Sequence, residues 1–487
     1  GGNYNVAVGD EAGTAITTGD NNTAIGFAAL DANTEGHSNT ALGSSAGTAI
    51  TTGDYNVAIG RNALDACTTA DNNVAVGWTA MGATTTGAGN TAVGGDSMAA
   101  NTTGTNNVAV GTASLDANTS GERNTAVGIQ ALGANTTGGY NTAVGERALD
   151  ANTTAANNTA VGSEALGANT TGTSNTAVGF GALDANTTAN SNTAIGKDAL
   201  TANTTGTANV AVGASSLQTI TTASYNVGVG NDVLGANTSG ASNTGVGNNA
   251  LGANTTGADN VAVGSLALDA NTTASYGVAI GSGSLGANTT GAYNVGVGFK
   301  ALETITTAGE NVGIGGYALR VNTSGTANVA IGYTALDANT SASYNTAVGH
   351  SALTTNTTGT QNTAVGYAAL DANTTGNYST CMGYLAGAAN TSGTEHTFIG
   401  YLAGRYTTGS GIDYNTGIGS RALYANSSGE QNVGVGAYAL NANTTASNNV
   451  GIGYNALGVN TTGADNTAVG AYALDANTTG IDNVAVG

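Results

Sequence analysis

Proline is absent from this 487-residue chain, and cysteine, charged and aromatic residues are scarce. Aromatic residues make up 5% of the sequence and charged residues 8%, so the chain cannot build the bulky cores of several globular domains. No run of about eighteen apolar residues occurs, which argues against insertion into a membrane. The two cysteines, Cys67 and Cys381, lie far apart in the sequence, and we expect both to be small buried residues rather than a disulfide.

Positive charge is also scarce, because 8 Lys and Arg stand against 29 Asp and Glu and give a formal net charge of −21. A nucleic-acid partner needs a basic surface that neutralises phosphates, so this balance argues against one. Three histidines, His37, His350 and His396, fall at three different positions of the repeat described next, so no two should share a metal. No catalytic motif is present, and we expect no enzyme activity and no cofactor.

What fills the chain is a 17-residue repeat, which residues 124–140 show as Asn-Thr-Ala-Val-Gly-Ile-Gln-Ala-Leu-Gly-Ala-Asn-Thr-Thr-Gly-Gly-Tyr. Repeats start at Asn5 and follow every 17 residues to His396, then continue from Asn415. Residues 1–487 therefore form a single array of 28 full repeats and part of another. Residues 379–414 are irregular and contain a two-residue insertion, which we interpret as a plain insertion, a bend or a binding loop. So constant a period predicts a solenoid of stacked coils.

We number each repeat 1 to 17 from its leading Asn. Positions 2 to 4 are β-branched around one small residue, which predicts a strand with positions 2 and 4 on one face and position 3 on the other. Positions 8 to 12, Ala-Leu-x-Ala-Asn, predict a second short strand in which positions 9 and 11 share a face. We expect positions 2, 4, 9 and 11 to meet in the interior. The fold class is then all-β, a parallel β-solenoid of 17-residue coils with two short strands per coil.

Three other positions carry structural information. Position 5 is Gly in every repeat, as at Gly128, Gly145 and Gly162, which indicates a positive φ or a close backbone approach. Position 12 is usually Asn but is Ile in four repeats, so it is at least half buried, and we expect an Asn ladder along the stack. In the regular middle of the array, from Asp116 to Asp184, position 10 alternates between Asp and Gly, which separates like charges and indicates that coils stack in register.

Position 3 is Ala or Gly in every repeat except at Cys381 and Phe398, although a solvated strand face would accept larger polar residues. With other positions assigned to the interior, we expect this column to pack against the same column of other chains in a parallel homotrimer. The expected subunit-interface residues are Ala126, Ala143, Ala160 and Ala177.

Two surface features are candidates for binding. Aromatic residues at positions 6 and 7 become dense late in the chain and either recognise a cell-surface glycan or receptor or cover a groove between subunits. Adjacent Thr residues at positions 13 and 14 form columns that suggest an ice-binding solenoid as the alternative function, although adjacent residues should point apart. The candidate surface-binding aromatics are Tyr367, Tyr384, Tyr401 and Tyr454.

The sequences Tyr-Asn-Val-Ala-Ile-Gly at 55–60 and Asn-Asn-Val-Ala-Val-Gly at 72–77 resemble the Asn-Ser-Val-Ala-Ile-Gly signature of trimeric autotransporter adhesin heads. The Asn-Thr-Ala-Val-Gly repeats are also similar to those of bacteriophage tail-fibre proteins. The resemblance implies a left-handed β-roll, three chains per rod and a role in attachment. This chain departs from the adhesin heads in its 17-residue coil, where theirs is usually shorter. We therefore expect a structural and adhesive fibre shaft located outside the cell, on a cell surface or on a virion.

Overall fold

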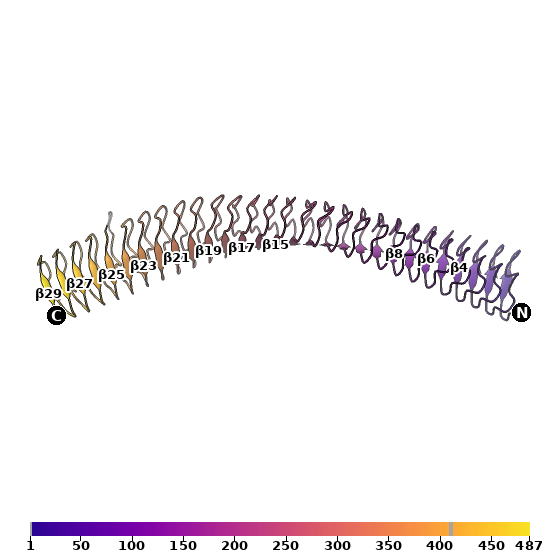
Figure 1. Ribbon diagram of the computed structural model, residues 1–487, viewed down its shortest axis with the longest axis horizontal. Helices are drawn as coiled ribbons and strands as arrows, with labels where there is room; N and C mark the ends of the chain where they lie inside the picture. Colours follow the sequence, from indigo (N-terminus) through magenta and orange to yellow (C-terminus); the bar gives the residue numbers. More distant parts are fainter. Residues whose placement is uncertain (1, 409–412) are drawn as a thin grey trace. The chain divides into compact units, whose positions relative to one another are not determined.

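The computed structural model describes residues 2–408 and 413–487, and every regular element in these residues is a β-strand. The chain forms two compact units, Gly1–Ser242 and Asn243–Gly487, which we call unit 1 and unit 2. Each unit is a stack of coils in which one three-residue strand per coil pairs in parallel with the next (Figure 1). The predicted all-β parallel solenoid of 17-residue coils is thus confirmed.

The strands occupy positions 2 to 4 of each coil. In unit 1 they are β1 (Val6–Val8), β2 (Thr23–Ile25), β3 (Thr40–Leu42), β4 (Val57–Ile59), β5 (Val74–Val76), β6 (Thr91–Val93), β7 (Val108–Val110), β8 (Thr125–Val127), β9 (Thr142–Val144), β10 (Thr159–Val161), β11 (Thr176–Val178), β12 (Thr193–Ile195), β13 (Val210–Val212) and β14 (Val227–Val229).

The strands of unit 2 follow the same pattern. They are β15 (Thr244–Val246), β16 (Val261–Val263), β17 (Val278–Ile280), β18 (Val295–Val297), β19 (Val312–Ile314), β20 (Val329–Ile331), β21 (Thr346–Val348), β22 (Thr363–Val365), β23 (Thr380–Met382), β24 (Thr397–Ile399), β25 (Thr416–Ile418), β26 (Val433–Val435), β27 (Val450–Ile452), β28 (Thr467–Val469) and β29 (Val484–Val486).

Register is regular in both units. Thr142 pairs with Thr159, 17 residues later, and the same step relates the described pairs of neighbouring strands at every place but one. Across the predicted insertion the step is 19, because Thr397 of β24 pairs with Thr416 of β25. The two additional residues therefore leave the strand register intact. Most of that insertion, residues 409–412, lies outside the described residues.

The strand turns its small residue inward, opposite to the prediction. Ala126, Ala143, Ala160 and Ala177 are completely buried inside the single chain, whereas positions 2 and 4 lie on the outside. The reason is the thinness of the coil, since the opposite wall carries a fully buried Leu at position 9. A Cβ added at Gly228, at position 3, would lie 3.1 Å from Cγ of Leu217. These alanines therefore cannot form a subunit interface, and that prediction is wrong.

The wall opposite the strand, positions 8 to 12, is a series of turns rather than the second strand that the pattern predicted. Leu149 at position 9 has φ of 53° and Arg147 at position 7 has φ of 57°, so left-handed residues alternate along this wall. Its backbone still bonds to the next coil, because the Leu149 N–H donates to the Ala165 carbonyl at 3.0 Å. Positions 8 and 9 are both buried in consequence, as in Ala148 and Leu149. The interior is filled by positions 3, 8, 9 and 12.

The glycines at position 5 have both a positive φ and a close backbone neighbour, the two explanations that the sequence suggested. Gly128, Gly145 and Gly162 have φ between 134° and 139°. A Cβ at Gly128 would also lie 2.5 Å from the carbonyl oxygen of Gly145 in the next coil. Any side chain here is therefore excluded by the backbone conformation and by the neighbouring coil.

Each unit contains stretches of two Asn ladders, one at position 1 and one at position 12, of which the sequence predicted the second. At position 12, Asn135 Nδ2 donates to Asn118 Oδ1 at 3.0 Å, which confirms the expected ladder. At position 1, the Asn141 N–H donates to Asn124 Oδ1 at 3.0 Å, and Asn141 Nδ2 donates to the Ala155 carbonyl at 2.9 Å. Both columns are buried, so the amides satisfy backbone groups that the tight turns leave without strand partners. Asn135 also begins an Asn-Thr-Thr glycosylation sequon, but a sugar on this buried side chain would require the folded coil to open.

Candidate functional site

In each unit the strands present an uncharged outer face, which we call the strand face and define as positions 2 and 4 of the coils in that unit. Each of the 29 strands begins with Thr or Val and ends with Val, Ile, Leu or Met. The position-4 residues are substantially solvent-exposed, as Ile195 is at 40%. Sequence reasoning missed this face, although the absence of any charge at two alternating positions was visible as a signal.

A row of rings, the aromatic column, lies on the surface of unit 2. Position 6 supplies most of its members, and Tyr317 at position 7 replaces the missing side chain of Gly316. Adjacent rings in the row have centroids 5.3 to 5.9 Å apart. The column consists of Phe299, Tyr317, Tyr333, His350, Tyr367, Tyr384 and Tyr401.

The structure unites three of the four candidate aromatics. Tyr367, Tyr384 and Tyr401 stack with interplanar angles of 14° and 15°, whereas Tyr454 belongs to a separate group with Tyr472. All four side chains are about half exposed, between 46% and 51%. Stacked rings turn their faces towards each other, so the column presents mainly ring edges and hydroxyl groups to solvent. His350 was not expected in this row.

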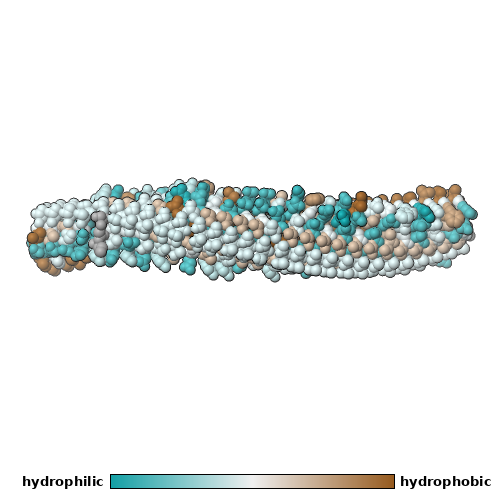
Figure 2. All heavy atoms as spheres, turned by 90° about the horizontal axis from the view of Figure 1, so that it is seen from above, coloured by the Kyte–Doolittle hydropathy of each residue, from teal (hydrophilic) through white to brown (hydrophobic). Residues whose placement is uncertain are grey.

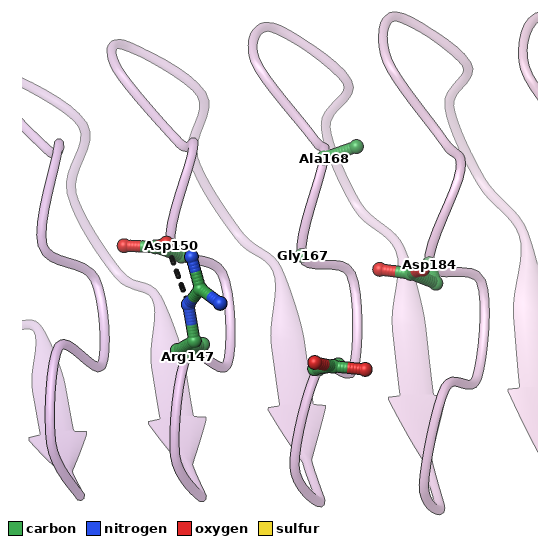
Figure 3. Close-up of a pocket in the computed structure, with 6 residues that line it drawn as sticks. Arg147, Asp150, Gly167, Ala168 and Asp184 are labelled. Carbon is green, nitrogen blue, oxygen red and sulfur yellow. Dashed lines mark ion pairs between the residues drawn. The ribbon is translucent and has the colours of Figure 1, made fainter.

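The Asp and Gly residues of position 10 form a shallow hollow in unit 1. Its volume is about 290 Å³, and Figure 3 shows Arg147 and Asp150 of one coil beside Gly167 and Asp184 of the next two. The Arg147 guanidinium lies 3.5 Å from the Asp150 carboxylate. Burial raises the pKa of Asp184, and the nearby Glu164 carboxylate raises it further.

Alternation at position 10 has a direct structural reason. A Cβ at Gly167 would lie 2.7 Å from Oδ1 of Asp184, so the aspartate occupies space that the neighbouring glycine leaves empty. The same holds for Gly133, whose Cβ would lie 3.0 Å from Oδ1 of Asp150. Among residues 2–408 and 413–487, no group of three or more His, Cys, Asp or Glu side chains is placed to hold a metal ion.

The Thr columns at positions 13 and 14 differ from each other. Thr136 Oγ1, at position 13, donates to the Thr153 carbonyl of the next coil at 3.0 Å. The neighbouring Thr137, at position 14, is exposed. Position 13 therefore uses its hydroxyl within the chain, whereas position 14 presents its side chain to solvent.

Both cysteines are buried free thiols, as the sequence predicted. Burial raises the pKa of the Cys67 thiol to about 11, and burial also raises the pKa of Cys381. Cys67 occupies position 12 and its Sγ contacts the Ala70 carbonyl at 3.7 Å. Their role is to fill the interior.

Seen from above, much of the surface is of intermediate hydropathy, with scattered hydrophilic residues and smaller apolar spots (Figure 2). Within the described part of the chain, the structure contains no helix of the length and apolarity needed to cross a bilayer. Comparison of the sequence with known protein families finds no match, and comparison with curated proteins finds none either.

Proposed function

We propose that this chain is the shaft of a structural fibre, in which parallel copies associate as a homotrimer through the strand face. The uncharged strand face is the observation that carries the proposal, because both outward positions are aliphatic or Thr in all 29 strands. A solvated sheet face has no physical reason to exclude charge so completely. We further propose an extracellular location, on a bacterial surface as an adhesin or on a virion as a tail fibre, and no catalytic role.

The area of the strand face supports self-association. With a coil spacing of about 4.8 Å and strands about 10 Å long, the face measures roughly 700 Å² in each unit. Thr begins 15 of the 29 strands, so only part of this face is apolar, but that part still amounts to roughly the few hundred Å² that monomeric proteins rarely exceed. Covering the face of one unit with another copy would remove roughly 1,400 Å² from water, which lies in the range of stable interfaces.

The distribution of charge also favours association through the strand face. Each copy carries a formal net charge of −21, so copies repel wherever their carboxylates approach. Positions 2 and 4 carry no Asp, Glu, Lys or Arg in any strand. The strand face is therefore where copies of this acidic chain can approach at least electrostatic cost.

Sedimentation equilibrium of the chain tests this proposal. We expect a mass three times that of one chain, and we expect Val127→Glu, Val144→Glu and Val161→Glu together to give folded monomers. The control replaces Thr137, Thr154 and Thr171, at the exposed position 14, with Glu and should remain trimeric. A folded wild-type monomer at micromolar concentration would overturn the proposal.

We propose that attachment to a surface glycan or receptor uses the exposed aromatics. The support is their exposure and their concentration in unit 2. Replacing Tyr367, Tyr384, Tyr401 and Tyr454 with Ser should abolish attachment to cells and leave circular dichroism unchanged. Attachment at the wild-type level by that variant would refute the assignment.

Ice binding is a second candidate. One observation favours it, and it concerns the strand face and not the Thr columns at positions 13 and 14. Strands β8 to β12 all begin with Thr, so five successive coils place an outward Thr beside an outward Val or Ile. This gives a regular array of hydroxyl and methyl groups on a hydrogen-bonded sheet. Thermal hysteresis at micromolar protein would support this candidate over the fibre shaft, and its absence would remove it.

A further inference from the structure

Three of the five basic residues in the position 7 and position 10 columns pair with a carboxylate at position 10, which we call the pairing rule. Arg147 and Lys300, at position 7, each pair with the carboxylate at position 10 of the same coil, at 3.5 and 2.8 Å. Arg320, at position 10, pairs with Asp337 at position 10 of the next coil, at 2.9 Å. The carboxylate at position 10 therefore neutralises cations from both columns.

Two arginines of unit 2 break this rule at one residue. Arg405 is at position 10 and Arg421 is at position 7 of the following coil, so the rule assigns both of them the same partner. That partner position is occupied by Tyr424 and not by Asp or Glu. Within the described residues, neither guanidinium forms an ion pair, and Asp413 in the same region lies 3.2 Å from the buried His396.

Aromatic rings surround the two cations. The Arg405 guanidinium lies 5.1 Å from the ring centre of Tyr406, and that of Arg421 lies 5.6 Å from Tyr424 and 5.8 Å from Tyr438. The Tyr406 and Tyr424 rings meet edge to face at 5.1 Å. A hydrogen bond to Tyr406 raises the pKa of Tyr424, so this phenol stays neutral and does not balance the positive charge.

We propose that Arg405 and Arg421, with the phenols of Tyr406 and Tyr424, bind the anionic group of an acidic saccharide. Two half-buried guanidinium groups with no carboxylate partner among the described residues, in a chain of net charge −21, favour a carboxylate or sulfate from outside. Phenol rings and hydroxyls beside them suit the apolar faces and hydroxyl groups of a sugar. Tyr401, the last ring of the aromatic column, belongs to the same coil as Arg405. The site goes beyond the proposed shaft role, because a monomeric chain would carry it equally.

Calorimetric titration at low salt tests the site with defined probes. We expect trigalacturonate and a sulfated heparin tetrasaccharide to bind, maltotriose not to bind, and higher salt to weaken binding. Arg405→Gln and Arg421→Gln should each lower the affinity about tenfold, as expected for the loss of one charge-assisted hydrogen bond. Tyr424→Asp should abolish binding, since it restores the carboxylate that the pairing rule requires.

Arg320→Gln is the matched control, because Arg320 occupies the same position as Arg405 and also lies 5.2 Å from a Tyr ring, but is paired with Asp337. It changes the net charge equally and should leave the affinity unchanged. Circular dichroism would verify that each variant is folded. The proposal is overturned if no acidic probe binds, if Arg320→Gln weakens binding as much as Arg405→Gln, or if Tyr424→Asp binds normally. Equal binding of inorganic sulfate or a tetraglutamate peptide would also overturn it, because the saccharide would then contribute nothing.

Discussion

The regular coils of residues 141–195 in unit 1 and the irregular coils that begin at Ser379 and His396 in unit 2 fill their interiors in opposite ways. In the regular coils, Ala143 at position 3 faces Leu149 at position 9, and both are fully buried. In the irregular coil, Phe398 stands at position 3 and Gly404 at position 9. A Cβ at Gly404 would lie 2.5 Å from the Phe398 ring, so the ring occupies the space that Leu fills elsewhere.

The comparison teaches that the interior constrains the summed volume and not the individual residue. The first coil shows a related exchange, because Gly13 replaces Leu at position 9 and Ile16 replaces Asn at position 12. A Cβ at Gly13 would lie 3.0 Å from Cδ1 of Ile16. Surface positions are not constrained by a summed volume in this way. At position 7, for example, Arg147 forms an ion pair with Asp150, whereas Arg421 forms none among the described residues.

The largest effects should come from changing the residues at positions 3 and 9 that fill the interior, first in the irregular coil and then in a regular one. Phe398→Ala empties the interior and should destabilise β23 to β25 by about 3–5 kcal/mol. Ala143→Phe should overpack its coil by about 1–3 kcal/mol, and Leu149→Gly alone should leave a cavity. The double variant Ala143→Phe with Leu149→Gly should lose clearly less stability than the sum of the two single variants, because the Phe ring fills the cavity left by Leu149.

Hydrogen exchange of the adjacent strands is the suitable measurement, since coils of a solenoid open locally. Phe398→Leu serves as the control because it keeps most of the apolar volume. Strictly additive effects of Ala143→Phe and Leu149→Gly would contradict the exchange of volume between positions 3 and 9.

A feature common to both kinds of coil should respond equally in both. Gly128 and Gly400 have φ of 135° and 137°, and a Cβ at either would lie 2.5 Å from the next glycine oxygen. Replacing either with Ala should therefore cost about 2–3 kcal/mol, measured by urea-dependent hydrogen exchange. Gly95→Ala is the control, because a Cβ there meets nothing within 4 Å. A cost at Gly128 as small as at Gly95 would contradict the close approach of coils.

Substitutions at position 12, which carries the Asn ladder, should have smaller effects on stability and should differ between regular and irregular coils. Asn135→Ala should cost about 1 kcal/mol in the local free energy of opening, because neighbouring amides can bond within their own turns. Asn33, which lies between Ile16 and Ile50, does so by donating to the Gly36 carbonyl at 3.2 Å. In the irregular coil Thr407 holds position 12 and its buried Oγ1 has no hydrogen-bond partner among the described residues. Thr407→Val should therefore be neutral or stabilising, and equal losses at Asn135 and Thr407 in hydrogen exchange would count against the ladder.

The smallest expected effect is a pH dependence confined to regular coils. Burial raises the folded-state pKa of Asp116 and Asp184, and both aspartates occupy position 10. A raised folded pKa gives stability that is complete below the ordinary pKa of 3.8 and is lost as pH rises through the raised value. Calorimetry should therefore show Tm rising by no more than a few degrees on acidification from neutral pH to about pH 3.5.

Asp116→Asn with Asp184→Asn should flatten part of this rise, because neither amide titrates. Residual self-repulsion of a chain with net charge −21 also relaxes in acid, so the double variant and not the wild type isolates the position-10 contribution. An unchanged slope in the double variant would show that burial of these carboxylates has no thermal consequence.

The repeat period made the fold predictable, but it did not reveal which side chains point into the interior and which point outward. A β-branched residue on either side of Ala126 is consistent with both faces of a strand, and the pattern alone does not say which face is inside. The second strand failed for another reason. Leu149 adopts a left-handed conformation that is rare for a bulky residue, so Ala-Leu-x-Ala was interpreted as extended chain.

The candidate site was predictable only in part. The exposure of Tyr367 and Tyr384 follows from position 6, which changes freely between repeats, and the sequence identified both. The ring stacking depends on side-chain geometry across coils and was not predictable from spacing alone. The pairing of Arg320 with Asp337 required knowing that position 10 faces position 10 of the next coil. Once that is known, Tyr424 stands out in the printed sequence.

The strict register of 17 residues per coil has a mechanical consequence. Neighbouring strands such as β9 and β10 are joined by backbone hydrogen bonds that run from coil to coil, so tension between the ends of a unit loads these bonds directly. A stacked coil contributes about 4.8 Å of length, but its chain pulled straight contributes roughly 58 Å. Each coil that yields therefore lengthens a unit by about 50 Å and leaves the remaining coils paired, so that a sudden pull is absorbed in separate steps.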